Sequence, residues 1–277
     1  MLRQIIQTTR GVPASDGAGV KLTRIIASPE IDMIDPFLLL DRFESENPDD
    51  YIAGFPPHPH RGFETVTYML AGRMRHKDNA GNEGVIEPGG VQWMTAARGI
   101  IHSEMPEQNE GLMKGFQLWI NLPGSHKMNA PKYQEFSPSD IPAEPTEMGG
   151  TIGVITGKTD GGTTGPVINT LTDPLYLDVT LTANEVFTQS VPATHNAVIY
   201  MIDGEVSVDG KILRPEQLGV FGDGLGVQMT SQSGGARFLL MAGKRLGEPV
   251  ARGGPFVMNT RAEVLQAFED FKAGRFA

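Results

Sequence analysis

The sequence predicts an all-β protein built from two similar β-sandwiches or barrels in tandem, with one helix at the C-terminal end. Three observations support this prediction. Short segments rich in β-branched and aromatic residues alternate with glycine and proline turns, the two halves of the chain share a strand pattern, and one helix signal stands near residue 260. A length of 277 residues fits one large domain or two of ordinary size, and 39% hydrophobic residues can fill a core.

The strand signal is carried by short segments bounded by Gly or Pro. They are rich in Val, Ile, Tyr, Phe and Thr, which favour a pleated and partly buried surface. The segments are 64–72, 84–94, 114–123, 175–182, 196–208, 217–222 and 236–243.

A helix is expected after Thr260. Thr260 and Glu263 have the spacing of a capping box, and Gly274 can end the helix. The residues that would share its apolar face are Val264, Ala267, Phe268 and Phe271.

The two halves of the chain resemble each other in sequence. "VTYMLAGRM" from Val66 matches "VIYMIDGEV" from Val198 at an offset of 132 residues, and Pro88 matches Pro215 at an offset of 127. Two matches in the same order indicate an internal duplication. We therefore predict a first domain over residues 1–130, a proline-rich linker over 131–150, and a second domain over 151–277 that ends in the helix.

The composition excludes several classes of protein. Acidic residues number 33 and basic residues 23, so the net charge is −10, and no basic cluster suggests a nucleic-acid partner. The absence of cysteine excludes disulfides and thiolate metal sites. The sequence shows no apolar segment typical of a secretion signal or a membrane-spanning helix. We therefore expect a soluble cytoplasmic protein without membrane partners.

Two short motifs concentrate the metal-binding residue types. "HPHRGFE" contains His58, His60 and Glu64, and "HSEMP" contains His102 and Glu104. Residues two apart on a strand share a face, so each motif can direct its side chains into a barrel. Three imidazoles with a carboxylate suit divalent iron, manganese, nickel, copper or zinc. The remaining histidines, His76, His126 and His195, are interpreted as surface or turn residues.

The second half of the chain has no such set. The offset of 132 places Ser190, Pro192 and Asn196 opposite His58, His60 and Glu64. The offset of 127 places Met229 and Ser231 opposite His102 and Glu104. We therefore expect one metal per chain, in the first domain.

The stretches "HPHRGFETVTYMLAG" and "PGGVQWMTAARGIIHSEMP", with the closing "GGPFVMNTRAEVLQAFEDFKAGRF", resemble the pirin family over nearly the whole chain. The resemblance implies two cupin (jelly-roll) β-barrels in tandem. It also implies one metal ion, usually iron(II), held by the positions that match His58, His60, His102 and Glu104. One position departs from the family pattern: Gly90 stands in a predicted turn where an acidic residue is expected.

The spacing alone does not decide which glutamate binds the metal. In many cupins the first motif supplies the carboxylate, which would be Glu64, whereas the pirin resemblance points to Glu104. We predict that Glu104 is the ligand and a catalytic base. Glu64 would assist catalysis by accepting a hydrogen bond from a ligand imidazole or from bound water. A salt bridge between Glu64 and Arg61, or another arginine at the barrel mouth, is the alternative.

The resemblance implies a metal-dependent dioxygenase of the quercetin 2,3-dioxygenase type, with a flavonol-like aromatic and dioxygen as substrates. The residues expected to wall its pocket are Phe55, Val66, Met94, Phe116 and Trp119. The main alternative is a non-enzymatic regulator whose metal shapes or switches a surface for a protein partner. A third is a cupin hydrolase or isomerase that uses metal-bound water.

Overall fold

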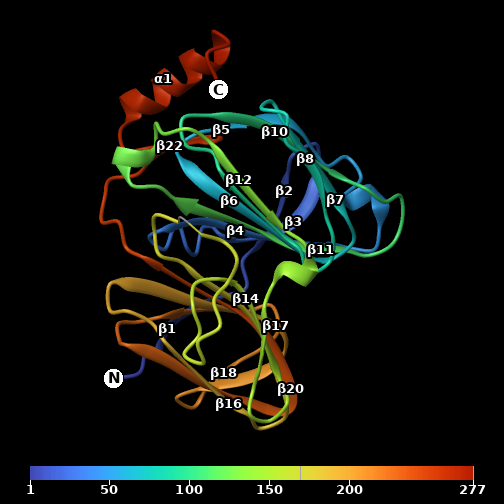
Figure 1. Ribbon diagram of the computed structural model, residues 1–277, viewed down its shortest axis with the longest axis vertical. Helices are drawn as coiled ribbons and strands as arrows, with labels where there is room; N and C mark the ends of the chain where they lie inside the picture. The colour runs from blue at the N-terminus through green and yellow to red at the C-terminus, as the bar shows by residue number, and fades with distance from the viewer. Residues whose placement is uncertain (169, 277) are drawn as a thin grey trace. The chain divides into compact units, whose positions relative to one another are not determined.

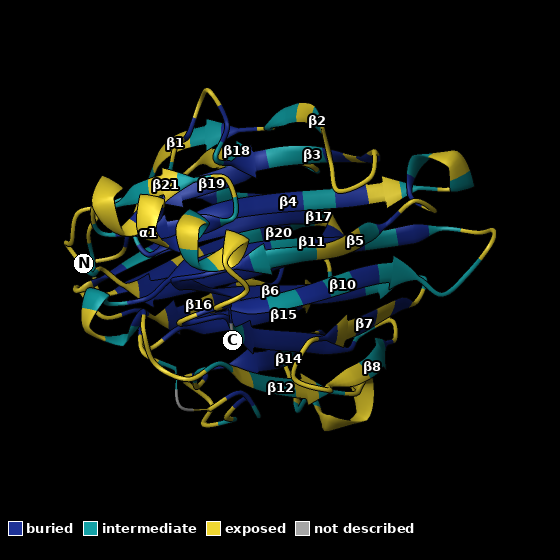
Figure 2. Ribbon diagram, turned by 90° about the horizontal axis from the view of Figure 1, so that it is seen from above, coloured by how far each residue is buried: buried dark blue, intermediate teal, exposed yellow. Residues whose placement is uncertain are grey.

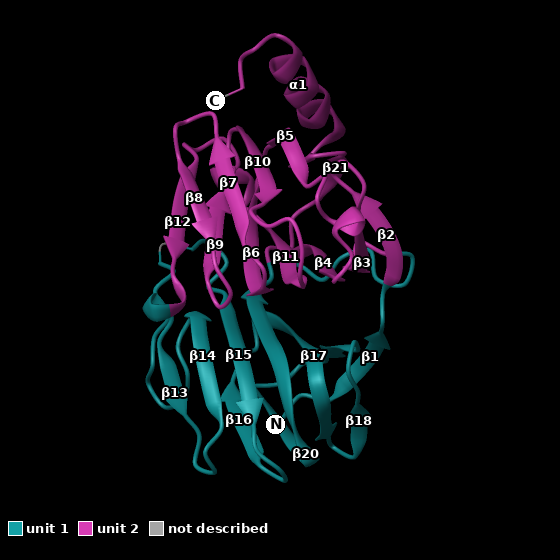
Figure 3. Cartoon of the chain, turned by 90° about the vertical axis from the view of Figure 1, so that its right-hand side faces the viewer, with its two compact units in different colours: residues 1–11, 29–36, 139–245 teal, residues 12–28, 37–138, 246–277 magenta. Residues whose placement is uncertain are grey.

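The computed structural model describes residues 1–168 and 170–276, and residues 169 and 277 lie outside this description. The described elements are mostly β-strands, as predicted, and the α-helix lies near the C-terminus (Figure 1). The described chain divides into two compact units (Figure 3). Unit 1 contains residues 1–11, 29–36 and 139–245, and unit 2 contains residues 12–28, 37–138 and 246–277.

Unit 2 contains two antiparallel sheets and a short hairpin. The larger sheet has the order β12-β9-β6-β11-β4-β3-β2, the smaller one β5-β10-β7-β8, and β21 pairs with β22. Their bounds are β2 (Val12–Asp16), β3 (Val20–Ile26), β4 (Phe37–Ser45), β5 (Phe55–His60), β6 (Phe63–Ala71), β7 (Met74–Asp78), β8 (Glu83–Ile86), β9 (Val91–Thr95), β10 (Ile100–Pro106), β11 (Met113–Asn121), β12 (Lys132–Phe136), β21 (Ala251–Gly253) and β22 (Phe256–Met258).

Unit 1 contains one sheet with the path β1-β19-β17-β20-β15-β14-β13, to which β16 and β18 add at the sides of β20 and β17. Its strands are β1 (Ile5–Thr9), β13 (Ala143–Pro145), β14 (Thr151–Thr156), β15 (Leu175–Leu181), β16 (Val186–Ser190), β17 (His195–Val208), β18 (Lys211–Leu213), β19 (Leu218–Phe221) and β20 (Gly226–Lys244).

The strand order supports the predicted duplication. The path β9-β6-β11-β4-β3-β2 of unit 2 has its counterpart in β19-β17-β20-β15-β14-β13 of unit 1. The matched valines, Val66 and Val198, lie on the corresponding strands β6 and β17. In unit 1, β17 and β20 are single long strands that pair along most of their length. In unit 2 the counterpart of β17 is divided into β6 and β7, and the counterpart of β20 is divided into β10 and β11.

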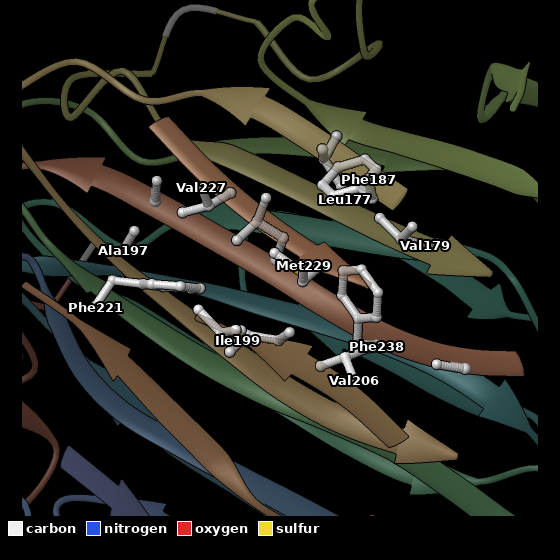
Figure 4. Packing of buried hydrophobic residues seen from close by; sticks show 14 of the residues in the cluster. Leu177, Val179, Phe187, Ala197, Ile199, Val206, Phe221, Val227, Met229 and Phe238 are labelled. Atoms are coloured by element: carbon white, nitrogen blue, oxygen red, sulfur yellow. The ribbon is translucent and has the colours of Figure 1, made fainter. Parts of the chain in front are cut away.

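A continuous apolar core fills unit 1. Figure 4 shows Phe187, Met229 and Phe238 packed among Leu177 and Ile199, all of them buried. Unit 2 is buried along its central strands as well, and in Figure 2 most of β6 is dark blue while much of α1 is yellow. Burial of apolar side chains on this scale is the main favourable term for both units.

The compact units differ from the predicted domain ranges. The predicted linker, 131–150, contains β12, which pairs with β9 in unit 2, and β13, which pairs with β14 in unit 1. The C-terminal helix α1 (Arg261–Lys272) belongs to unit 2 rather than to the second half of the chain, and residues 1–11 belong to unit 1. These differences have one cause. A segment packs with its hydrogen-bonded or contacting partners, and those partners can lie far away in the sequence.

The helix has the predicted start and face. Thr260 and Glu263 form the capping box, and Val264 and Ala267 are buried. Phe271 is instead 38% exposed. Among the described residues, no helix is both long and apolar enough to span a membrane.

Arg61 connects the helix to the sheets of unit 2. Its Nη1 lies 2.8 Å from Asp270 Oδ2 on α1, its Nε donates to the Arg98 carbonyl, and its guanidinium lies 4.3 Å from the centre of the Phe276 ring. The acidic partner of Arg61 is therefore Asp270 and not Glu64. The predicted alternative of a salt bridge between Arg61 and Glu64 is therefore wrong.

Candidate metal centre

Two neighbouring strands bring three histidines together. His58 and His60 lie on β5, and the antiparallel register places His102 of β10 directly opposite His58. The ring centroids are 4.5 Å apart for His58 and His102, 4.6 Å for His58 and His60, and 5.0 Å for His60 and His102. One ring nitrogen from each histidine lies within 4.8 Å of the others, so the three could hold a metal ion.

Burial disfavours the protonated form of two of the three histidines. His60 and His102 are buried, and burial lowers the pKa of both imidazoles well below the usual value, with the neighbouring histidines adding to the effect. The Nε2 atoms of His58 and His60 face each other at 2.9 Å. Neither ring nitrogen of His102 has a hydrogen-bond partner among the described residues. Imidazoles with converging ring nitrogens, of which both on His102 lack a hydrogen-bond partner, are a donor set that fits a divalent first-row metal.

Glu104 lies two residues after His102 on β10, and burial raises the pKa of its carboxyl group. Its Oε1 accepts a hydrogen bond of 2.9 Å from Thr67 Oγ1. Glu104 lies outside the group of described ligand atoms that are within 4.8 Å of one another. It lines the same cavity as His58 and His60, and the hydrogen bond from Thr67 occupies only Oε1, so Oε2 is the oxygen left for a cation held there.

Thr67 is fixed by a second contact. Its hydroxyl lies 2.6 Å from Oε1 of the Gln117 side-chain amide, and a 180° flip of that amide would place its nitrogen at this position. A hydroxyl has a single proton, so Thr67 cannot donate to both groups. We therefore assign the amide nitrogen of Gln117 as the donor to Thr67, and Thr67 as the donor to Glu104. This arrangement holds the carboxylate of Glu104 in one orientation.

The structure does not bring Glu64 to the histidines. The predicted face assumed one strand from His58 onward, but β5 ends at His60 and β6 belongs to the other sheet. Gly62 turns the chain with φ of +93°, and a Cβ there would lie 1.9 Å from the Val257 carbonyl oxygen. On β6 the odd-numbered side chain Thr67 faces the cavity, so Glu64 faces away from it and accepts a 2.7 Å hydrogen bond from Thr95.

His76 is part of the interior rather than of the surface. The register of β7 and β10 places it opposite Glu104, and it is 1% exposed. Its ring stacks on Tyr133, and its Nε2 lies 2.5 Å from Glu135. The sequence did contain a signal, because buried Met74, His76 and Asp78 alternate with charged residues on β7.

The other two histidines lie away from the cluster. His195 begins β17 in unit 1 and is 4% exposed, so it is a buried residue and not a surface one. His126 ends the short 3-10 turn η2 (Gly124–His126) and contacts the Ser125 hydroxyl, as a turn residue would.

A cavity of about 680 Å³ opens beside the cluster within unit 2. Phe55 and Trp119 line it as predicted, whereas Val66, Met94 and Phe116 are buried elsewhere. The apolar part of the lining includes Leu22, Leu38, Leu39, Phe43, Phe55, Met74 and Trp119. A large apolar cavity with a few converging polar groups is the usual form of a small-molecule site.

Two family models match the chain, Pirin over residues 19–120 and the Pirin C-terminal cupin domain over residues 176–277. The chain belongs to the pirin family. A pirin-like protein of Caulobacter vibrioides is 52% identical over 278 residues, with 99% of each chain covered. A Pseudomonas aeruginosa protein named "putative quercetin 2,3-dioxygenase" is 48% identical over 283 residues, covering 99% of this chain and 98% of its own.

A solved structure agrees with this assignment. The crystal structure of quercetin 2,3-dioxygenase from Acinetobacter baumannii has a TM-score of 0.91 and 32% identity, and the match covers 100% of this chain and 99% of the other. The predicted fold class is thus confirmed: this pirin is an all-β chain of two cupin domains with a C-terminal helix.

Unit 1 of this pirin has apolar side chains where unit 2 has histidines. β16 pairs with β20 as β5 pairs with β10, and the pair Phe187 and Met229 takes the place of His58 and His102. Both residues are buried in the core of unit 1. The structural counterpart of His58 is therefore Phe187 and not Ser190, because the turns in the two units differ in length.

Proposed function

We propose that this chain is a metal-dependent dioxygenase that cleaves quercetin or a related flavonol. It would use one divalent ion held by His58, His60, His102 and Glu104. The observation that carries the proposal is the meeting of a buried histidine cluster with an apolar cavity of about 680 Å³. The similarity to a solved quercetin 2,3-dioxygenase supports it.

Iron(II) is our first choice of metal, with manganese, nickel, copper and zinc as the other ions that nitrogen and oxygen ligands accept. When bound, the ion would supply Lewis-acid stabilisation to a deprotonated flavonol oxygen and a site for dioxygen chemistry.

Glu104 would hold the ion through Oε2 and accept the proton of the flavonol 3-hydroxyl group at Oε1, which keeps a lone pair beside the hydrogen bond from Thr67. Burial raises the pKa of this carboxyl group, which makes it a stronger base than a carboxylate in water. Thr67 donates to Oε1 at 2.9 Å and so restrains the carboxylate, which leaves Oε2 for the ion.

The apolar walls would orient the substrate and exclude water. Trp119 lies beside His60, with ring centroids 5.2 Å apart, so a flat ring that reaches the histidines would contact the indole. Phe55 and Leu39 line the same cavity. Both atoms of dioxygen would enter the product, and the central ring would open with release of one carbon as carbon monoxide.

The test is to follow the visible absorbance of quercetin with and without oxygen while carbon monoxide is measured. Metal-loaded wild type should turn over in air, and metal-depleted protein should not. Glu64→Gln should retain activity, because Glu64 faces away from the cavity. If iron-, manganese-, nickel- and copper-loaded protein all leave quercetin intact, the metal-dependent regulator with a protein partner becomes the better account.

Replacing Thr67 tests the placement of Glu104. Thr67→Val keeps the side-chain shape and removes the hydroxyl that orients the carboxylate. We expect metal affinity to fall about 10- to 100-fold, the usual effect of losing a group that orients a ligand. Thr95→Val is the matched control, because Thr95 bonds to Glu64, and it should change affinity less than about threefold. Equal effects of the two variants, measured by competition with a chelator, would contradict this role.

A further inference from the structure

A row of polar side chains crosses the larger sheet of unit 2 and ends at the candidate metal centre. Arg24 of β3 is opposite Asp41 of β4, Asp41 is opposite Gln117 of β11, and Gln117 is opposite Thr67 of β6. All four side chains line the cavity, and Thr67 bonds to Glu104. Three steps between strands of about 4.8 Å separate Thr67 from Arg24, so this polar row is about 14 Å long.

Apolar side chains flank the polar row. Leu39 and Trp119, which are register partners, line the cavity on one side of it, and Phe43 lies on the other side along β4. A flat aromatic ligand could therefore stack on apolar walls while one of its edges follows the row. The row is long enough for all three rings of a flavonol.

The far end of the row is a fixed ion pair. Arg24 Nε and Nη2 donate to the two oxygens of Asp41 at 3.0 and 2.7 Å, and Nη2 also reaches Asp16 at 2.7 Å. Asp41 is 4% exposed, and burial raises its pKa to about 6 against the opposing effect of Arg24. At neutral pH it is mostly ionised, and its two oxygens offer about four acceptor positions. The bonds from Arg24 leave some of these positions free for a ligand.

We propose that the Arg24–Asp41 pair binds a phenolic hydroxyl group on the substrate ring farthest from the metal centre. The polar row would then select polyhydroxylated flavonols over unsubstituted ones. This inference rests on the proposed flavonol dioxygenase activity and names the part of the substrate that the cavity recognises.

The charges of the lining favour a neutral hydroxyl over a carboxylate at this position. Among the described residues of the lining, Asp16, Asp41 and Glu104 are acidic, and Arg24 and Arg252 are basic. Because Arg24 is already shared by Asp16 and Asp41, it has no positive charge in excess to offer an anion. A phenol can donate to the Asp41 carboxylate, and charge-assisted bonds of this kind are among the stronger hydrogen bonds.

The test compares two ligands by calorimetry without oxygen, on iron-loaded protein. Quercetin carries hydroxyl groups on both outer rings, and 3-hydroxyflavone keeps only the group next to the ketone. Wild type should bind quercetin about 10-fold or more tightly than 3-hydroxyflavone. The double variant Arg24→Met/Asp41→Leu removes the pair without leaving a buried charge alone. It should lose this preference and bind 3-hydroxyflavone within about twofold of wild type.

Asp41→Asn provides a second variant of unchanged size, and its preference should lie between those of wild type and the double variant. The inference is overturned if the double variant, with normal metal content and circular dichroism, keeps the preference for quercetin. It is also overturned if wild type binds both ligands equally, an outcome that leaves the proposed dioxygenase standing. Failure of both ligands to bind to wild type would overturn the proposed function together with this inference.

Discussion

His102→Ala should reduce the bound metal from one ion per chain to a small fraction of that value and abolish quercetin cleavage. His102 is buried beside His58 and His60, and no described residue bonds to either of its ring nitrogens. Its ring nitrogens therefore contribute no hydrogen bond to the fold, and one of them can bind the ion. Removing one of four ligands should cost more than the roughly 10- to 100-fold that follows the loss of an orienting group.

His126→Ala is the matched control, because it makes the same substitution in the same unit at a turn residue. Elemental analysis of both variants, purified without chelator, gives the result directly. Full occupancy in His102→Ala, or two ions per chain in wild type, would contradict a single centre in unit 2.

Glu104→Gln and Glu64→Gln separate the two carboxylates. Glu104 lines the cavity and Glu64 faces away from it, so only the first substitution should lower metal content and activity. Both glutamates are buried, so each variant places an amide in the interior. Any effect of the buried amide itself would therefore appear in both variants, and only a loss confined to Glu104→Gln indicates a lost ligand. Loss of metal in Glu64→Gln alone would show that the carboxylates have been assigned in the wrong order.

Local strand geometry accounts for what the sequence predicted well. His58 and His60 share a face because both lie on β5, and the two-residue spacing of His102 and Glu104 on β10 works in the same way. The segments that became β6, β11 and β17 were recognised from their composition, because burial selects β-branched and aromatic residues there.

Long-range contacts account for what the sequence did not reveal. The face of Glu64 was mispredicted because the chain changes sheets at Gly62, and Gly62 is required there by the close approach of Val257 from the far end of the sequence. The pairing of β12 with β9 and the attachment of α1 through Asp270 depend on similarly distant partners. Alternation within one segment carries no information about these contacts.

Lys127→Met should lower the free energy of unfolding of unit 2 by about 2–4 kcal/mol. Each buried oxygen left without a donor costs about 1–3 kcal/mol. Removal of the buried ammonium, which is itself costly to bury, offsets part of that cost. Lys127 is 1% exposed. Its Nζ donates to the Gly62 carbonyl at 2.6 Å, to Asn121 Oδ1 at 2.5 Å and to the Val257 carbonyl at 3.0 Å. Burial lowers its pKa to about 8, so at pH 7 the ammonium still has three protons for three oxygens.

This lysine also connects stability to the metal centre. Gly62 follows His60 by two residues, and Lys127 fixes the turn between them and β6. Lys127→Met should therefore weaken metal retention as well as stability, whereas Lys77→Met, at a side chain 66% exposed on β7, should change stability by less than about 0.5 kcal/mol. Urea unfolding of metal-free protein measures the first effect, and chelator competition measures the second. Unchanged stability in Lys127→Met would mean that water satisfies the three oxygens equally well, and the turn at Gly62 would then need another explanation.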